Sequence, residues 1–249
     1  MKKTALERDL VFVDIETSGF SPETQEILEI ACIRTTSDAR EITGSFECLV
    51  LPEHIETASP EALIINGYQE GEWAFDGVSL DTALEKFLNI CFGGVTLVAH
   101  SATFDWGFLR AALTRKSLLA DLDYHIICTA SLSWPLVMRG EVVSPKLEAL
   151  CTHFGISNEG QYSAMRDVER MLAVYRRLVP VPAVAGISPK LDVNSDYGKQ
   201  GFRGGGYEIL ADGSERILPG VQTEYRSAYP NIELEAPEIP VKPDDKRRI

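Results

Sequence analysis

Three short apolar runs in the first fifty residues constrain the fold of this chain more than any other feature. They cover residues 10–14, 27–36 and 42–51, and turn-forming residues at 18–22 separate the first two. Short apolar runs bounded by Gly, Pro and Ser are typical of β-strands. We therefore expect three successive strands that pair antiparallel.

After this region the pattern changes to helices that alternate with strands. Apolar periodicity predicts helices near 79–91, 103–116, 146–154 and 163–178, and strands at 95–99 and near 126–129. Three strands followed by such alternation imply a mixed five-stranded α/β sheet with helices on its faces.

The composition changes near residue 180. The last 69 residues hold seven of the 13 prolines and eight of the 19 glycines, and apolar periodicity disappears there. We predict one folded domain over 1–180 and an irregular Pro/Gly-rich extension over 181–249, with a hairpin at 207–218. Two interpretations of the extension stay open, a partly ordered tail and an arm that grips a partner or substrate.

The formal charge of −13 disfavours binding of a nucleic acid through a broad basic surface. It does not disfavour a nuclease site made of carboxylates and divalent cations, because bound cations reverse the local field. The five cysteines are widely spaced without a CxxC pair, which indicates free thiols in a reducing compartment. No apolar run approaches the ~18 residues of a membrane span. We expect a cytoplasmic protein with no membrane partner.

The first apolar run ends in two carboxylates, Asp14 and Glu16. Side chains at positions i and i+2 of a strand point to the same face of the sheet. Two acids beside a buried strand are unfavourable unless a cation or a hydrogen-bond donor compensates them. A divalent metal would do so, and an exposed strand end would explain the pair equally well.

Two further acids follow buried segments. Asp105 lies in the first turn of the helix predicted near 103–116, and Asp167 in the first turn of the helix predicted near 163–178. Acids in a first turn are also explained by capping and by the helix dipole. Each acid alone therefore leaves a structural and a functional interpretation open.

Together, the three motifs resemble those of the DnaQ-like 3′→5′ exonucleases. That family has an Asp-x-Glu on its first strand, an Asp after a strand and a His-Asn-Ala-x-Phe run, and an Asp in its last helix. These positions match Asp14 and Glu16, Asp105, and Asp167. The resemblance covers residues 10–178.

The resemblance implies a ribonuclease-H-like fold in which the four acids bind two Mg²⁺ or Mn²⁺ ions. Four acids without cations would raise one another's pKa values, whereas two ions ~3.5–4 Å apart neutralise them and promote in-line phosphodiester hydrolysis. By the family pattern, Asp14 bridges both ions, Glu16 and Asp167 hold the water-bearing ion, and Asp105 supports the site. The implied activity releases 5′-mononucleotides from single-stranded DNA or RNA 3′ ends.

The chain departs from the family pattern at the general base. The histidine subgroup has a His five residues before the last Asp, where this chain has Tyr162; the tyrosine subgroup has its Tyr four residues before, where this chain has Ser163. A phenol with a pKa near ~10 is a poor base at pH 7, although it can orient a water molecule. We expect a slow enzyme or one with a raised pH optimum. A catalytically inactive domain that binds nucleic acid or a partner is the alternative, and an unrelated α/β domain is a third interpretation.

Substrate contacts are expected from aromatic faces, since an exonuclease must accept every base. Phe20 and Phe104 match positions where family members place rings on terminal bases, and plain packing explains Phe104 equally well. By the same resemblance, Ile15 and Thr17 should contact the last nucleotide, and His100 should shape the site. The sequence is compatible with DNA or RNA and with a monomer or a homodimer.

Overall fold

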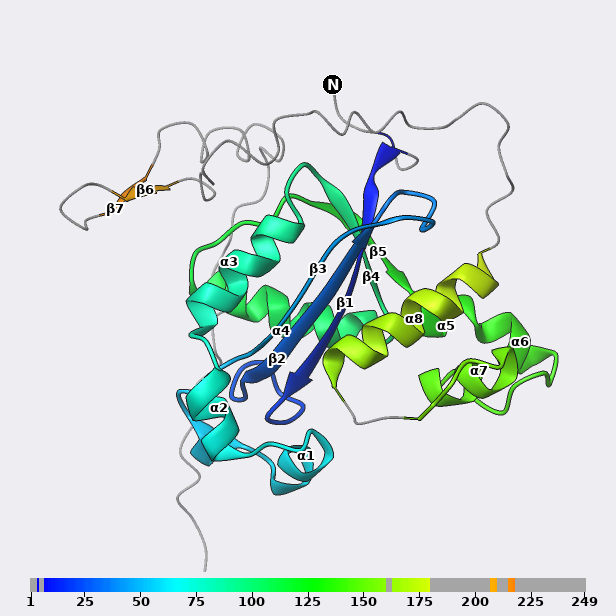
Figure 1. Cartoon of the computed structure of the whole chain (residues 1–249), viewed down its shortest axis with the longest axis horizontal. Coiled ribbons are helices and arrows are strands. Elements are labelled where there is room, and N and C mark those ends of the chain that lie inside the picture. Colours follow the sequence, from blue (N-terminus) through cyan, green and yellow to red (C-terminus); the bar gives the residue numbers. More distant parts are fainter. Residues whose placement is uncertain (1–3, 5–6, 160–162, 180–206, 210–214, 218–249) are drawn as a thin grey trace, which may run out of the picture. The chain divides into compact units, whose positions relative to one another are not determined.

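A computed structural model describes residues 4, 7–159, 163–179, 207–209 and 215–217 of the chain (Figure 1). The chain divides into two units, Met1–Gln200 and Gly201–Ile249. In the second unit, β6 (Tyr207–Ile209) pairs antiparallel with β7 (Glu215–Ile217). Tyr162, the boundary near 180 and the rest of the predicted extension lie outside the described residues.

The first unit is built on a five-stranded sheet with the strand order β3-β2-β1-β4-β5. The strands are β1 (Asp9–Thr17), β2 (Ile27–Thr35), β3 (Ile42–Leu49), β4 (Val95–Ala99) and β5 (Leu122–Cys128). The first three strands pair antiparallel, β4 lies parallel to β1, and β5 lies parallel to β4. The predicted mixed sheet is therefore confirmed.

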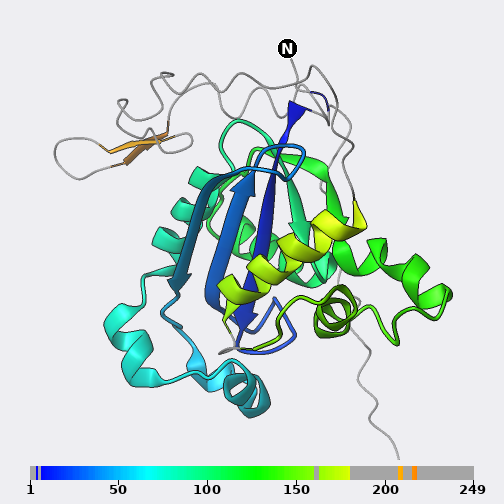
Figure 2. The same ribbon diagram turned by 45° about the vertical axis from the view of Figure 1, so that its right-hand side comes forward.

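Long helices cover both faces of this sheet (Figures 1 and 2). The helices α3 (Leu80–Ile90) and α4 (Ala102–Arg115) pack on one face, and α8 (Ala164–Leu178) packs on the other. Side chains of β1 alternate between the two cores: Val13 packs with α3 and α4, and Phe12 packs with α8.

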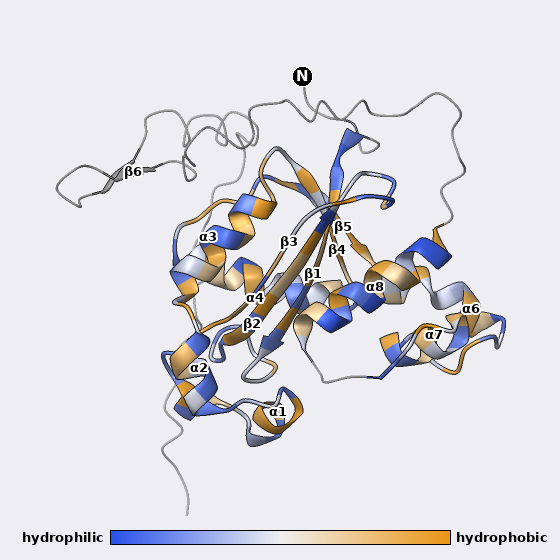
Figure 3. Cartoon of the chain, in the orientation of Figure 1, coloured by the Kyte–Doolittle hydropathy of each residue, from blue (hydrophilic) through white to orange (hydrophobic). Residues whose placement is uncertain are grey.

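Hydropathy follows this layering. In Figure 3 the central strands are mostly orange, and blue appears where β1 ends. The pleat of β1 puts Asp14 and Glu16 on the same face as Phe12, which is the face that α8 covers. The last acid of the predicted set, Asp167, is carried by that helix.

Four of the helices match their predicted ranges to within one residue at each end: α3, α4, α7 (Leu147–Phe154) and α8. The structure adds short helical segments that the sequence did not predict: η2 (Ile55–Thr57), α1 (Pro60–Ile65), α2 (Glu70–Asp76), α5 (Thr129–Leu132) and α6 (Trp134–Met138). A tertiary contact holds α2 in place, since the Trp73 indole N–H donates to the Leu28 carbonyl at 2.9 Å.

All five cysteines are free thiols, and four of them are buried. Burial raises the pKa of Cys91 to about 12, so this thiol stays protonated and packs as a small apolar group. Among the described residues, no helix has the length and apolar character needed to cross a bilayer.

Candidate active site

Asp14 and Glu16 lie near the end of β1 in a strongly acidic environment. Burial raises the pKa of Asp14 well above its usual range, and the charges of Asp105, Glu16 and Asp167 raise it further. Burial also raises the pKa of Glu16 to about 7, with help from the charges of Glu29, Asp167 and Asp105. The charges of neighbouring acids thus add to the effect of burial in disfavouring ionisation of Asp14 and Glu16.

Asp105 comes from the first turn of α4 and is 3% exposed. Burial raises its pKa to about 7, although its carboxylate accepts backbone N–H groups, including those of Ile15 and Ser101. The bond from Ile15 joins α4 to β1 between Asp14 and Glu16. The bond therefore links the third acid to the strand that carries the first two.

Asp167 comes from the first turn of α8. This helix begins after Ser163, whose hydroxyl accepts the N–H of Arg166 at 3.3 Å as an N-cap. The Asp167 carboxylate pairs with Arg170 at 3.0 Å, and its charge raises the pKa values of Asp14 and Glu16. The structure thus brings all four predicted acids together from β1, α4 and α8.

The donor chemistry of this cluster fits a hard divalent cation, because carboxylate oxygens are the preferred ligands of Mg²⁺ and Mn²⁺. A cation would also relieve the repulsion that raises the pKa values. In the described part of the chain, however, no group of three or more His, Cys, Asp or Glu side chains forms a finished cage for a metal ion. Cation binding would therefore require the acid side chains to draw together.

Glu29 is a fifth acid of the cluster that the sequence did not reveal. It lies opposite Glu16 in the β1–β2 register, is 7% exposed, and accepts the N–H of Ala164 at the start of α8. Burial raises its pKa to about 7, and the bond from Ala164 opposes this shift. A charge inside the second apolar run, between Leu28 and Ile30, is the signal that could have identified it.

His100 follows β4 and is fixed by neighbouring segments. Its Nδ1 lies 2.9 Å from the Thr129 hydroxyl, and its ring donates to the Pro145 carbonyl. Burial lowers its pKa. These contacts hold the His100 ring in place after β4, and its expected role in shaping the site stays a prediction. Tyr162 lies outside the described residues.

Phe20 and Phe104 form an aromatic pair beside Asp105. Phe20 is 81% exposed, and its ring centre lies 6.3 Å from that of Phe104 at an interplanar angle of 64°. Phe104 also contacts Phe108, with 5.1 Å between ring centres. Phe104 thus packs against the core and adjoins an exposed ring, so both interpretations of this residue have structural support.

Ile15 and Thr17 are buried at the end of β1. The Thr17 hydroxyl donates to the Gly19 carbonyl at 2.6 Å, and the Ile15 N–H is bound by Asp105. Both residues therefore shape the turn and the acid cluster. Their expected contact with a nucleotide stays a prediction.

Comparison with known proteins relates the chain to nucleases. A family model described as Exonuclease matches residues 11–175. Ribonuclease T of Salmonella typhimurium is 31% identical over 186 residues, which cover 68% of this chain and 83% of that enzyme. A Mycobacterium tuberculosis protein named as a candidate bifunctional exonuclease/endonuclease is 27% identical over 195 residues, but the match covers 76% of this chain and only 29% of that protein.

Solved structures of Escherichia coli exonuclease I share the fold. Its complex with a dT13 oligonucleotide superposes with a TM-score of 0.60 at 18% identity. The match covers 70% of this chain and 42% of exonuclease I. At this identity the comparison establishes the architecture alone.

Proposed function

The chain belongs to the DnaQ-like exonuclease family, and from this premise we propose that it is a metal-dependent 3′→5′ exonuclease acting on single-stranded 3′ ends. The family resemblance and the ribonuclease-H-like fold expected from the sequence are confirmed. The observation that carries the proposal is the acid cluster, in which Asp105, Glu16 and Asp167 all raise the pKa of Asp14.

Asp14, Glu16, Asp105 and Asp167 would hold two Mg²⁺ or Mn²⁺ ions. When bound, such ions supply an activated water and stabilise the charge on the leaving 3′ oxygen. The protein's part is to keep the acids in place: the Ile15 N–H holds Asp105, and Arg170 holds Asp167. Tyr162, in the position of the family histidine, is proposed to orient the attacking water through its hydroxyl.

A single strand is the proposed substrate because its unpaired bases can stack on the exposed Phe20 ring and on Phe104. The net charge of −13 also disfavours a broad electrostatic grip on a duplex. Stacking accepts any base, as an exonuclease requires. Related exonuclease I has been solved with dT13 and with dA16 oligonucleotides.

The proposal is tested by digestion of a 5′-labelled single-stranded oligonucleotide with Mg²⁺, Mn²⁺ or EDTA. We expect a ladder of fragments shortened from the 3′ end, release of 5′-mononucleotides, and no product in EDTA or with Asp14→Asn. A 3′-phosphorylated oligonucleotide and a circular single strand serve as controls. Cleavage of the circle, or shortening from the 5′ end, would contradict the proposal.

The inactive binding domain is the second candidate, favoured by Tyr162 in place of the histidine and by the fixed ring of His100. It predicts that the chain binds the same oligonucleotide and releases no nucleotide at any pH between 6 and 10. The digest decides between the two candidates.

A further inference from the structure

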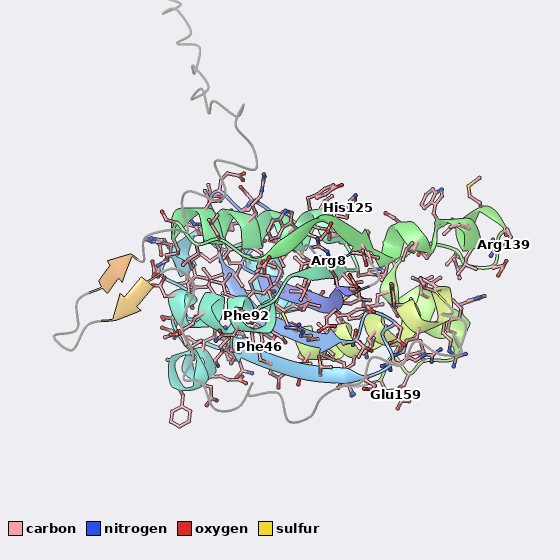
Figure 4. The ribbon with its side chains drawn as sticks, turned by 90° about the horizontal axis from the view of Figure 1, so that it is seen from above. Arg8, Phe46, Phe92, His125, Arg139 and Glu159 are labelled. Atoms are coloured by element: carbon pink, nitrogen blue, oxygen red, sulfur yellow. The ribbon has the colours of Figure 1, made fainter. Side chains whose placement is uncertain are left out.

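Arg170 joins the acid cluster to the segment that precedes α8. It lies one helical turn after Asp167 and is 9% exposed. Its Nη1 donates to Asp167 Oδ1 at 3.0 Å, and its Nη2 donates to the Glu159 carbonyl at 3.2 Å. Glu159 follows α7 and lies on the α8 side of the sheet (Figure 4). One guanidinium thus ties the last acid to the backbone before the helix.

Arg170 forms an ion pair with one of the four acids only, Asp167. In the part of the chain that the structure describes, the pair with Arg170 is the only ion pair that involves any of the four acids. It uses one oxygen of Asp167. The Arg170 Nε is buried without a hydrogen-bond partner, which is unfavourable for a charged group. The two Nη contacts therefore set the position of the guanidinium.

We propose that Arg170 is a positioning residue for the cation site. It holds Asp167 through Oδ1 and braces it against the Glu159 carbonyl, so that the second carboxylate oxygen is directed to the cation. This inference rests on the proposed function, because it takes Asp167 as a cation ligand. A guanidinium suits the task since its fork reaches two acceptors at once, whereas an ammonium is a point charge.

For the loss of Arg170, a positioning role and a purely electrostatic effect predict opposite changes in the affinity for a divalent cation. A positive side chain beside a ligand repels a divalent cation, so electrostatics alone predicts that loss of Arg170 strengthens metal binding. Groups that orient metal ligands have the opposite effect, because their loss weakens metal binding or activity by about 10–100-fold. We expect the orienting effect to be the larger one. The described acids do not form a finished metal site, so cation binding depends on groups that hold each ligand in place.

The test is calorimetric titration of the full chain with Mn²⁺ alone, without nucleic acid and well below the melting temperature. We expect Arg170→Met to weaken Mn²⁺ binding by about tenfold or more. Arg170→Lys should fall between Arg170→Met and the wild type, because it keeps the charge but cannot hold both acceptors. Arg177→Met, which removes an exposed arginine from the end of the same helix, is the matched control and should bind as the wild type does.

Unchanged or tighter Mn²⁺ binding by folded Arg170→Met would overturn the inference, and so would wild-type affinity of Arg170→Lys. A purely structural role would lower the melting temperature of the metal-free variant and leave the affinity unchanged. Should Arg170→Met fail to fold, the lysine variant decides. If the wild type binds no Mn²⁺, the proposed function is wrong, and the Arg170 inference is wrong with it. If the wild type binds Mn²⁺ and Asp14→Asn does not, the cation site is present, and the Arg170 variants then test only the role of Arg170.

Discussion

Glu29 of β2 lies directly opposite Glu16 of β1, and its carboxylate accepts the first N–H of α8, from Ala164. A carboxylate in this place adds to the repulsion within the acid cluster, since its charge raises the pKa of Glu16. Its contribution to stability must therefore come from the hydrogen bond and not from its charge.

This relationship predicts different results for two substitutions of Glu29. Glu29→Gln keeps an acceptor for Ala164 and removes the charge, so the metal-free protein at pH 8 should be at least as stable as the wild type. Glu29→Leu leaves the buried N–H without a partner and should lower the free energy of unfolding by about 1–3 kcal/mol. Urea denaturation measures both; equal stability of the two variants would show that the bond contributes nothing.

The raised pKa values predict that the metal-free protein loses stability as the pH rises. Glu16, Glu29 and Asp105 have pKa values of about 7 in the folded chain, mainly because these side chains are buried, against 4.5 for an exposed Glu and 3.8 for an exposed Asp. Between these limits the folded state binds more protons than the unfolded state, so the free energy of unfolding falls from about pH 4 to about pH 7. Denaturation in EDTA across this range measures the slope.

The variant Asp14→Asn with Glu16→Gln is the control for this slope. It removes two of the interacting charges, so its stability should fall less steeply with pH. A stability that rises from pH 4 to pH 7 in the wild type, with the variant following the same curve, would contradict the description of the cluster.

Replacing Tyr162 with His should increase turnover at neutral pH. An imidazole with a pKa near ~6.5 can accept a proton at pH 7, whereas a phenol cannot. General base catalysis typically contributes ~10²–10⁴-fold, and the metal already supplies part of it, so we expect a gain of about tenfold or more and a lower pH optimum. Single-turnover rates from pH 6 to pH 10 provide the measurement; unchanged or slower turnover would show that Tyr162 does not occupy the histidine position.

Phe20→Ala should weaken oligonucleotide binding more than it slows the chemical step. Loss of one stacked base costs about 1–3 kcal/mol, so KM should rise by about fivefold or more while kcat changes little. Phe92→Ala removes another exposed ring, at the end of α3, and is the matched control. Equal KM values for the two variants would exclude Phe20 from the binding surface.

The elements that the sequence predicted well have strong local signals. The amphipathic helix α8 repeats its apolar residues at helical spacing, and β4 is a continuous buried run. The short helices α1 and α2 lack such periodicity. Their positions depend on contacts with distant residues, such as the bonds from Asn66 to the Thr17 carbonyl and from Trp73 to the Leu28 carbonyl.

The strand β5 shows the same limit. It begins at Leu122, four residues before the predicted start. The sequence does not indicate this first part of the strand, because it carries exposed polar side chains such as His125. An edge strand with one exposed face gives no continuous apolar run. Only its pairing with β4 reveals its full length.

The four acids of the candidate site can be proposed from the sequence because they lie near the end of a strand or in the first turn of a helix, in an order that resembles a known family. Glu29 and Arg170 cannot be proposed in the same way, because only tertiary contacts distinguish them, with Ala164 in one case and with Asp167 and Glu159 in the other. Sequence spacing identifies groups that could bind a cation. The groups that hold them in place become visible only when the chain is folded.

The proposed binding of two cations by the four acids can be tested directly in a crystal structure of the full chain soaked with Mn²⁺ and a nucleoside 5′-monophosphate, with data collected at the manganese absorption edge. We expect two anomalous peaks, both beside Asp14, with Glu16, Asp105 and Asp167 as the other protein acids around them. Anomalous peaks only at other places, with the side chains of these four residues pointing apart, would contradict it.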